Sequence, residues 1–151
     1  AKARRLKQRH DLKLIVIDYL QLMSSSKRVE NRQQEVSEFS RHLKLMAKEL
    51  NIPVIAISQL NRSPEQRSDK KPMLSDLRES GSIEQDADIV ILLHRDDLYD
   101  NQNRTGEADL IVAKHRNGPT KTITVSAQLH FSRFVDMAPS NFSADSFVKD
   151  N

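Results

Sequence analysis

The sequence predicts an α/β fold in which a mostly parallel sheet is followed by an antiparallel hairpin and meander. Two short apolar runs rich in β-branched residues, 13–18 and 54–58, are typical of strands. Between them, apolar side chains recur at steps of three and four, as on an amphipathic helix: Val36, Phe39, Leu43, Met46 and Leu50. The third observation is the Asn117-Gly118 pair, a strong hairpin signal between two later apolar runs.

The first half of the chain predicts a strand–helix–strand unit. Residues 1–10 start within a pattern of Ala and long basic side chains, so we expect the end of a helix cut from a longer chain. Within residues 13–18, Leu14 to Ile17 are continuously apolar and an acid follows, which is typical of a strand buried on both faces of a parallel sheet. Asn51 is suited to end the next helix in a left-handed conformation, and Pro53 prevents its continuation. Residues 54–58 then complete a right-handed βαβ crossover.

The middle of the chain is less regular. Residues 61–72 show no periodicity, so we expect a mobile loop, longer than most connections and of a kind that often carries function. Residues 76–86 predict a short helix or turn around Gly81, and residues 89–93 predict a third buried strand. Residues 96–106 are polar, which predicts a flexible stretch.

The second half predicts the antiparallel part of the fold. Residues 110–113 and 122–125 are the apolar strands on either side of a turn at 114–120. Three further apolar residues extend the meander: Leu129, Phe131 and Phe134. After residue 138 the composition turns to Ser, Asn and Asp, so we expect one domain at 1–138 and a disordered tail at 139–151.

Composition excludes several classes of function. The 151 residues contain no cysteine, which excludes disulfides, thiolate metal sites and cysteine nucleophiles, and fits a reducing, cytoplasmic location. No apolar run approaches the length of a membrane-spanning helix, so we expect no membrane partner. The three glycines, Gly81, Gly106 and Gly118, head no phosphate-binding loop. The five histidines show no metal-ligand spacing.

The net charge of +3 does not by itself indicate a nucleic-acid-binding protein. Five of the 24 basic residues stand among residues 1–9, where there is no acid. The remainder of the chain has 19 basic and 21 acidic residues. Any contact with DNA must therefore come from local loops rather than from a general basic surface.

Four side chains are candidates for phosphate chemistry. Asp18 and Gln59 each follow a predicted strand, and ligands of α/β sheets gather beyond the carboxyl ends of parallel strands. Lys114 and Arg116 lie one residue apart on the predicted hairpin and point to the same face, as a phosphate clamp requires. Taken singly, a strand-end acid, a polar strand end and a solvated turn explain these residues equally well.

A fifth candidate region surrounds the earliest glycine. Arg78 and the N–H of Gly81 are placed to bind a phosphodiester together, because glycine permits close approach of a backbone. The alternative is an ordinary helix cap.

In order along the chain, these pieces resemble successive motifs of the DnaB-type replicative DNA helicases. The resemblance extends from about Ala3 to Ala138 and is carried by four segments: Leu14–Met23, Pro53–Arg62, Leu77–Asp88 and Ala113–Thr120. It implies a RecA-like core of the P-loop NTPase class, incomplete here because the phosphate loop and the catalytic glutamate of such helicases lie upstream of residue 1. It also implies a homo-hexameric ring that moves 5′→3′ on single-stranded DNA with ATP and Mg²⁺, together with a primase and a helicase loader as partners.

The resemblance also implies roles for individual residues. Asp18 corresponds to the Walker B acid that holds Mg²⁺, through water, and Gln59 to the sensor of the γ-phosphate. Lys114 and Arg116 correspond to the basic pair, including an arginine finger, that reaches the ATP site of the neighbouring subunit. The DNA-binding loop corresponds to Arg78, Glu79 and Gly81, although an acid at 79 is unfavourable for phosphate binding.

Two other functions share parts of this pattern. A RecA-type recombinase or regulatory ATPase has the same acid and strand order, but we would not expect both the Arg78–Gly81 and the Lys114–Arg116 motifs in it. A non-catalytic module that docks to DNA or to a helicase is consistent with the missing phosphate loop. On any reading, we expect the 151-residue chain alone to hydrolyse no ATP and to bind DNA weakly and salt-sensitively.

Overall fold

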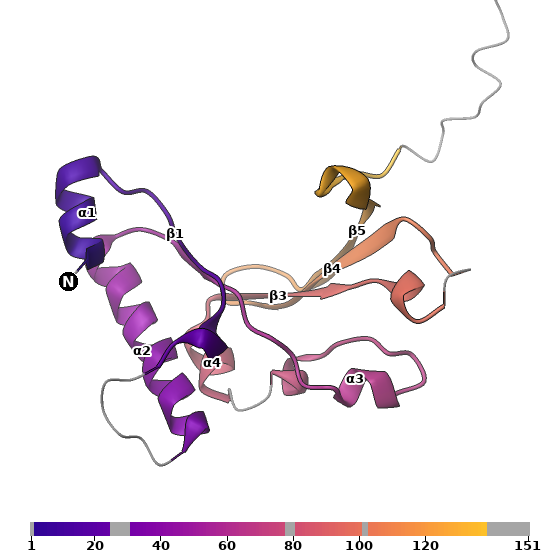
Figure 1. Ribbon diagram of the computed structural model, residues 1–151, viewed down its shortest axis with the longest axis horizontal. Coiled ribbons are helices and arrows are strands. Elements are labelled where there is room, and N and C mark those ends of the chain that lie inside the picture. Colours follow the sequence, from indigo (N-terminus) through magenta and orange to yellow (C-terminus); the bar gives the residue numbers. More distant parts are fainter. Residues whose placement is uncertain (1, 25–30, 78–80, 101–102, 139–151) are drawn as a thin grey trace, which may run out of the picture.

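The computed structural model describes residues 2–24, 31–77, 81–100 and 103–138. The helices are α1 (Lys2–His10), α2 (Arg32–Leu50), α3 (Ser63–Gln66) and α4 (Gly81–Asp86), with 3-10 turns η1 (Leu20–Leu22), η2 (Leu74–Asp76), η3 (Asp96–Leu98) and η4 (Leu129–Phe131). The strands are β1 (Ile15–Ile17), β2 (Val54–Ala56), β3 (Ile89–His94), β4 (Glu107–His115), β5 (Lys121–Gln128) and β6 (Arg133–Asp136). The predicted tail at 139–151 lies outside the described residues. Figure 1 shows α1, α2 and β1 at one end of the molecule and the sheet of β3 to β5 extending away from them.

The predicted strand–helix–strand unit is present. β1 and β2 are parallel, with Ile15 opposite Val54 and Ile17 opposite Ala56, and α2 connects them. The side chain of Asn31 caps α2 by accepting a hydrogen bond from the N–H of Gln33 at 2.9 Å. α2 ends as predicted, because Asn51 takes the left-handed conformation with a φ of 50°.

The second sheet is antiparallel and has the strand order β3-β4-β5-β6. It contains the predicted hairpin at Asn117-Gly118, and β6 extends the meander as expected. The α/β class is thus confirmed, but the antiparallel part is larger than the prediction of a mostly parallel sheet. The reason is that β3, expected beside the parallel strands, pairs instead with β4 along its whole length.

The prediction that the first strand is buried on both faces is wrong, and the predicted burial of the third strand holds for one face only. In β1, Val16 is 56% exposed, because β1 and β2 form a two-stranded sheet that packs against α2. In β3 burial alternates: Val90 and Leu92 are buried against Leu77, whereas Ile91, pointing to the other face, is 58% exposed. Within the described residues, an uninterrupted apolar run therefore indicates a strand with an apolar face that this chain does not cover by itself.

The segment at 61–72, expected to lack regular structure, contains the short helix α3 and is tied down by an ion pair. Arg67 donates to both carboxylate oxygens of Asp76, at 3.0 and 2.5 Å, and to the carbonyl oxygen of Lys71. Asp76 is 2% exposed and also accepts a hydrogen bond from the N–H of Met73 at 2.8 Å. The Arg67 guanidinium holds the pKa of the Asp76 carboxyl below its ordinary value. Because one arginine side chain makes these contacts, periodicity along the chain did not reveal them.

A second buried network fixes the far end of the antiparallel sheet. Arg104 donates to both carboxylate oxygens of Asp109, at 2.7 and 2.8 Å, and Thr124 donates to the same carboxylate from β5. Asp96, which also accepts from Arg104, lies 2.7 Å from the ring of His94. The stretch at 96–106, predicted to be flexible, is therefore anchored through Arg104 where it is described. No helix in the described part of the chain is both long and apolar enough to cross a membrane.

Candidate functional site

The carboxyl ends of β1 and β2 bring two of the predicted residues to one edge. The N–H of Ile57 donates to the carbonyl oxygen of Ile17, and the N–H of Leu20 donates back to the carbonyl oxygen of Ile57, both at 2.9 Å. Asp18 directly follows Ile17, and Gln59 follows two residues after Ile57; both are exposed. The sequence-based placement of Asp18 and Gln59 at neighbouring strand ends is thus what the structure has.

Gln21 is a contributor to this edge that the sequence analysis did not single out. Its side-chain Nε2 donates to the Ser58 hydroxyl at 3.0 Å and to the carbonyl oxygen of Gln59 at 3.3 Å. Its Oε1 accepts from the N–H of Gln59 at 3.3 Å. The only available signal was its place inside the segment that carries the family resemblance.

Arg32, at the start of α2, hydrogen-bonds the backbone at Gln21. Its guanidinium donates to the carbonyl oxygen of Gln21 at 2.6 Å and to that of Met23 at 2.9 Å. The same guanidinium pairs with Glu35 in the first turn of α2. The edge formed by Asp18, Ser58 and Gln59 is therefore held to the N-terminal end of α2.

The chemistry of this edge fits Mg²⁺ bound together with phosphates. The described residues contain no cluster of three or more metal-binding side chains. Mg²⁺ in nucleotide sites does not need such a cluster, because one or two carboxylates suffice when water and phosphate oxygens supply the remaining ligands. An exposed carboxylate at Asp18, with a neutral amide at Gln59 after the neighbouring strand, is a donor set of that kind.

Lys114 and Arg116 are engaged within the chain, whereas the sequence left them as a free clamp. Lys114 Nζ donates to the carbonyl oxygen of Glu84 and, at 3.3 Å, to that of Gln85. Arg116 donates to the same Gln85 oxygen at 3.3 Å, and its Nε lies 3.5 Å from the Asp88 carboxylate. Both cations lie on the same side of the hairpin, as predicted, and there they contact the end of α4.

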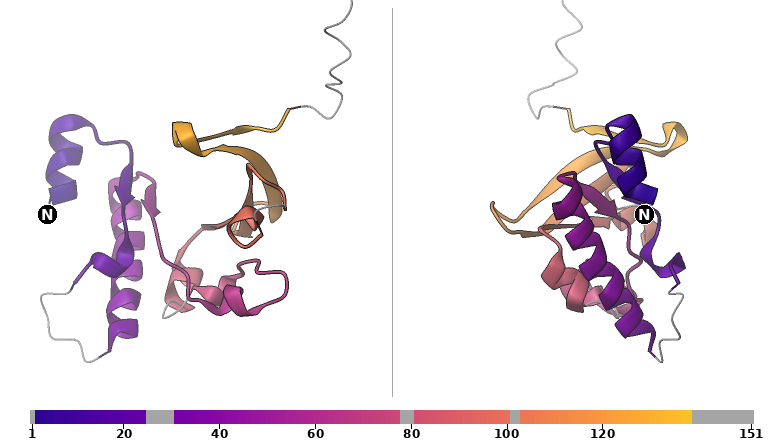
Figure 2. Two further views of the ribbon diagram at one scale, coloured as in Figure 1. Left: turned by 45° about the vertical axis from the view of Figure 1, so that its right-hand side comes forward. Right: turned by 90° about the vertical axis from the view of Figure 1, so that its left-hand side faces the viewer.

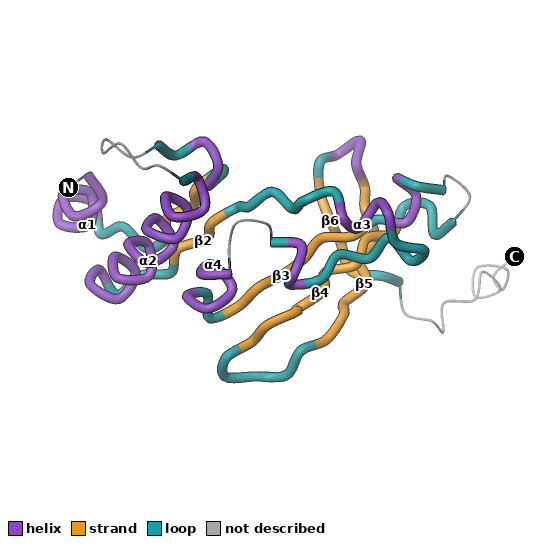
Figure 3. The backbone as a smooth tube through the Cα atoms, turned by 90° about the horizontal axis from the view of Figure 1, so that it is seen from below, coloured by secondary structure: helices purple, strands orange, loops and turns teal. Residues whose placement is uncertain are grey.

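The polar face of α2 holds α4 from the other side. Three α2 residues at helical spacing contact α4 or the residues just after it. The Ser37 and Ser82 hydroxyls are 2.8 Å apart, Ser40 donates to Asp86 at 2.8 Å, and Lys44 pairs with Asp88, two residues beyond α4. Lys44 holds the pKa of the Asp88 carboxyl below its ordinary value. Figure 3 shows α4 between α2 and the turn that joins β4 to β5.

The two groups of predicted residues lie on different sides of the molecule. Both views in Figure 2 place η1, which follows Asp18, and α4, whose end the basic pair contacts, on opposite sides of α2. Along α2 the contacts separate in the same way, because Arg32 supports the Asp18 edge and Lys44 contacts Asp88. With a rise of about 1.5 Å per residue, these two positions are about 18 Å apart along the helix axis.

The predicted DNA-binding loop is only partly described. Arg78 and Glu79 lie outside the described residues. Gly81 is the first residue of α4 and is exposed, and a Cβ added to it would meet no atom within 4 Å. No described part of this chain therefore requires glycine at position 81.

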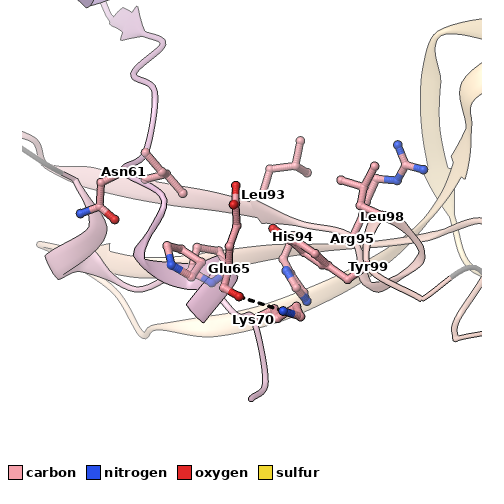
Figure 4. A pocket seen from close by; sticks show the side chains of 11 residues that line it. Asn61, Glu65, Lys70, Leu93, His94, Arg95, Leu98 and Tyr99 are labelled. Carbon is pink, nitrogen blue, oxygen red and sulfur yellow. Dashed lines mark hydrogen bonds between the residues drawn. The ribbon is translucent and has the colours of Figure 1, made fainter. Parts of the chain in front are cut away.

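A shallow pocket of about 110 Å³ lies elsewhere, between the α3 region and the end of β3. Figure 4 shows Asn61, Glu65 and Lys70 on one side of it and Leu93 and Tyr99 on the other. Lys70 Nζ donates to the carbonyl oxygen of Glu65 at 2.8 Å and stands 5.3 Å from the centre of the Tyr99 ring. None of the predicted site residues lines this pocket.

Comparison with known proteins decides the family. The model of the DnaB-like helicase C terminal domain matches residues 1–136. The chain belongs to this family. Over 139 residues, 91% of its length, it is 76% identical to "Replicative DNA helicase DnaB" of Mycobacterium leprae, and over 92% it is 74% identical to the protein of the same name from Leifsonia xyli. These relatives have the names of helicases and not of recombinases.

Solved structures show the same fold for this DnaB-like domain. A solved ATPase domain matches 91% of the chain with a TM-score of 0.86 and 46% identity, and the chain covers 49% of it. "The Structure Of A DnaB-Like Replicative Helicase And Its Interactions With Primase" matches with the same TM-score and identity, and the chain covers 33% of it. The chain spans 23% and 31% of the length of the two curated relatives named above.

Proposed function

We propose that this DnaB-like domain is the distal part of the ATPase of a replicative DNA helicase. In this proposal the helicase couples ATP hydrolysis to 5′→3′ movement on single-stranded DNA and to duplex unwinding at the replication fork. The observation that carries the proposal is that η1, next to Asp18, and α4, which Lys114 and Arg116 contact, lie on opposite sides of α2. A ring in which each ATP is bound between neighbouring subunits needs such a division, because each subunit then contributes different residues to two sites.

On one side, Asp18 and Gln59 act on the ATP held by their own subunit. Asp18 would hold Mg²⁺, and the ion would supply positive charge beside the transferring phosphoryl group. Gln59 hydrogen-bonds the attacking water or an oxygen of the γ-phosphate. Gln21 orients this edge, since its amide bonds both Ser58 and the backbone of Gln59.

On the other side, Lys114 and Arg116 act on the ATP of the neighbouring subunit. A guanidinium and an ammonium presented together stabilise the negative charge on the phosphoryl oxygens in the transition state. In the same assignment Arg78, Glu79 and Gly81 bind the DNA backbone. A homo-hexamer, primase and a helicase loader complete the assembly, with primase supported by the name of one solved relative.

The test is a helicase assay on a chain that also carries the proximal part of the ATPase domain. We expect ATP-dependent unwinding of a forked duplex with a 5′ single-stranded tail, and none with a 3′ tail. Asp18→Asn and Gln59→Ala should each lower ATP turnover by at least about a hundredfold, the scale of losing one transition-state contact. Full turnover in either variant would overturn the assignment of that residue.

A further inference from the structure

Lys114 and Arg116 make hydrogen bonds within their own chain that their proposed role does not use. If these cations act on a neighbouring ATP, their hydrogen bonds within this chain must have a separate purpose. The acceptors are the carbonyl oxygens of Glu84 and Gln85 and the carboxylate of Asp88, which we call the α4 dock. The dock is part of the same subunit as the two cations.

The α4 dock offers hydrogen-bond acceptors and a negative charge to cationic side chains. Carbonyl groups in the last turn of a helix lack partners within that helix, so they accept from side chains or water. Lys114 and Arg116 supply those donors, and the N–H of Arg116 also donates to the Asp88 carbonyl oxygen at 2.8 Å. The carboxylate of Asp88 adds the negative charge that carbonyl oxygens alone do not provide.

The ion pair of Arg116 with the α4 dock is also weak enough to be broken. The Arg116 and Asp88 side chains are 49% and 55% exposed, and their ion pair is long at 3.5 Å. Asp88 divides its charge, because its other carboxylate oxygen is bound by Lys44 of α2. Exposed pairs of this kind contribute little, and a phosphate, with more charge and more acceptors, competes successfully for the same guanidinium.

We propose that Asp88 is a positioning residue that holds Arg116, next to Lys114, on the α4 dock of its own subunit until a phosphate of the neighbouring site replaces Asp88 as the partner of Arg116. This rests on the proposed function of the basic pair. Since α4 begins at Gly81, a residue predicted to bind DNA, the same exchange joins the position of Gly81 to the position of the basic pair. Ser37 and Ser40 hold α4 to α2, and Lys44 holds Asp88, so α2 keeps the α4 dock in place during the exchange.

The test uses the 151-residue chain and inorganic pyrophosphate as the phosphate probe. In Asp88→Asn the shape is kept and the competing charge is removed, so we expect pyrophosphate to bind about twofold to fivefold tighter, the range of one exposed ion pair. Asp88→Glu keeps the charge and should bind as the wild type does. The matched control is Asp86→Asn, which removes the same charge two positions earlier, where the carboxylate accepts from Ser40 instead.

The outcomes separate the two proposals. If Lys114→Ala/Arg116→Ala binds pyrophosphate as tightly as the wild type does, the phosphate role of the pair fails and the exchange fails with it. If that double variant loses binding but Asp88→Asn matches the wild type, or matches an equally strengthened Asp86→Asn, only the α4 dock is overturned.

A measurement on the wild-type chain keeps the test independent of how the variants fold. In an NMR titration with pyrophosphate, the Arg116 Nε–H and the Asp88 carboxyl carbon should shift with one common midpoint, while the Asp86 carboxyl carbon stays in place. A response of Arg116 without any response of Asp88 would contradict the exchange.

Discussion

Gln21 Nε2 lies 3.0 Å from the hydroxyl oxygen of Ser58, and this bond joins the two strand ends that carry Asp18 and Gln59. The amide of Gln21 also exchanges two hydrogen bonds with the backbone of Gln59. One side chain thus fixes the spacing between the residue assigned to Mg²⁺ and the residue assigned to the γ-phosphate.

Replacing Gln21 should disturb that spacing without unfolding the domain. A neutral hydrogen bond contributes about 1 kcal/mol, so we expect Gln21→Ala to lower the free energy of unfolding by about 1 to 2 kcal/mol. ATP turnover in a chain that carries the proximal part of the domain should fall by about a hundredfold, because small displacements of catalytic groups are costly. Gln34→Ala, an exposed change on α2, is the control; equal losses in both variants would show that Gln21 has no special role.

Among the ionic contacts near η2, we expect the Arg67–Asp76 pair to contribute most to the free energy of unfolding. Asp76→Asn leaves Arg67 without its charged partner at a position where Asp76 is 2% exposed. We expect a loss of about 2 kcal/mol in urea unfolding, less than for a fully buried pair because Arg67 is 27% exposed. Asp69→Asn is the matched change, since Asp69 is 60% exposed and 4.0 Å from the same guanidinium. It should cost less than about 0.5 kcal/mol; similar losses for both would contradict this account.

Stability should depend on pH through Asp109. The hydrogen bonds from Arg104 lower the pKa of Asp109 to about 2, from 3.8. A lowered pKa means that the unfolded chain binds the proton more tightly, so this stabilisation is present above the unfolded pKa and is lost as pH falls through about 2. The difference corresponds to about 2 kcal/mol. Between about pH 5 and pH 2 the free energy of unfolding of Asp109→Asn should therefore fall by about 2 kcal/mol less than that of the wild type; parallel curves would refute the assignment.

The 151-residue chain by itself should hydrolyse no ATP, since none of its three glycines heads a phosphate-binding loop. A release assay for inorganic phosphate, with and without single-stranded DNA, checks this. Its DNA affinity should fall steeply between low and physiological salt, with about one or two phosphate contacts coming from one subunit. Nanomolar binding at physiological salt, or steady turnover, would be inconsistent with the proposed division of the site.

The local pattern of the chain predicted most of the fold. The spacing from Val36 to Leu50 predicted α2, the left-handed residue Asn51 predicted its end, and Asn117-Gly118 predicted the β4–β5 turn. Those features depend on residues near one another in sequence. The pairing of β3 with β4, by contrast, depends on which distant strand satisfies its edge, and an apolar run carries no information on that choice.

The sequence predicted residues of the candidate site but not the side-chain contacts that hold them in place. Asp18 and Gln59 could be placed because both end a strand. The bonds of Gln21, and the contact of Lys114 with the end of α4, join residues about thirty positions or more apart through side chains that no periodicity singles out. The roles of Asp18, Gln59, Lys114 and Arg116 remain predictions that follow from the family and from their placement.

The most direct test of the two-sided site is a mixing experiment with two inactive helicase variants that carry the proximal part of the domain. One is Asp18→Asn and the other is Arg116→Ala. If the two residues serve different ATP sites, an equal mixture regains ATP turnover, because about a quarter of the subunit interfaces in randomly assembled rings are then intact. If both residues serve the same site of a single subunit, no mixture contains an intact site, and turnover that stays absent at every ratio would contradict the account.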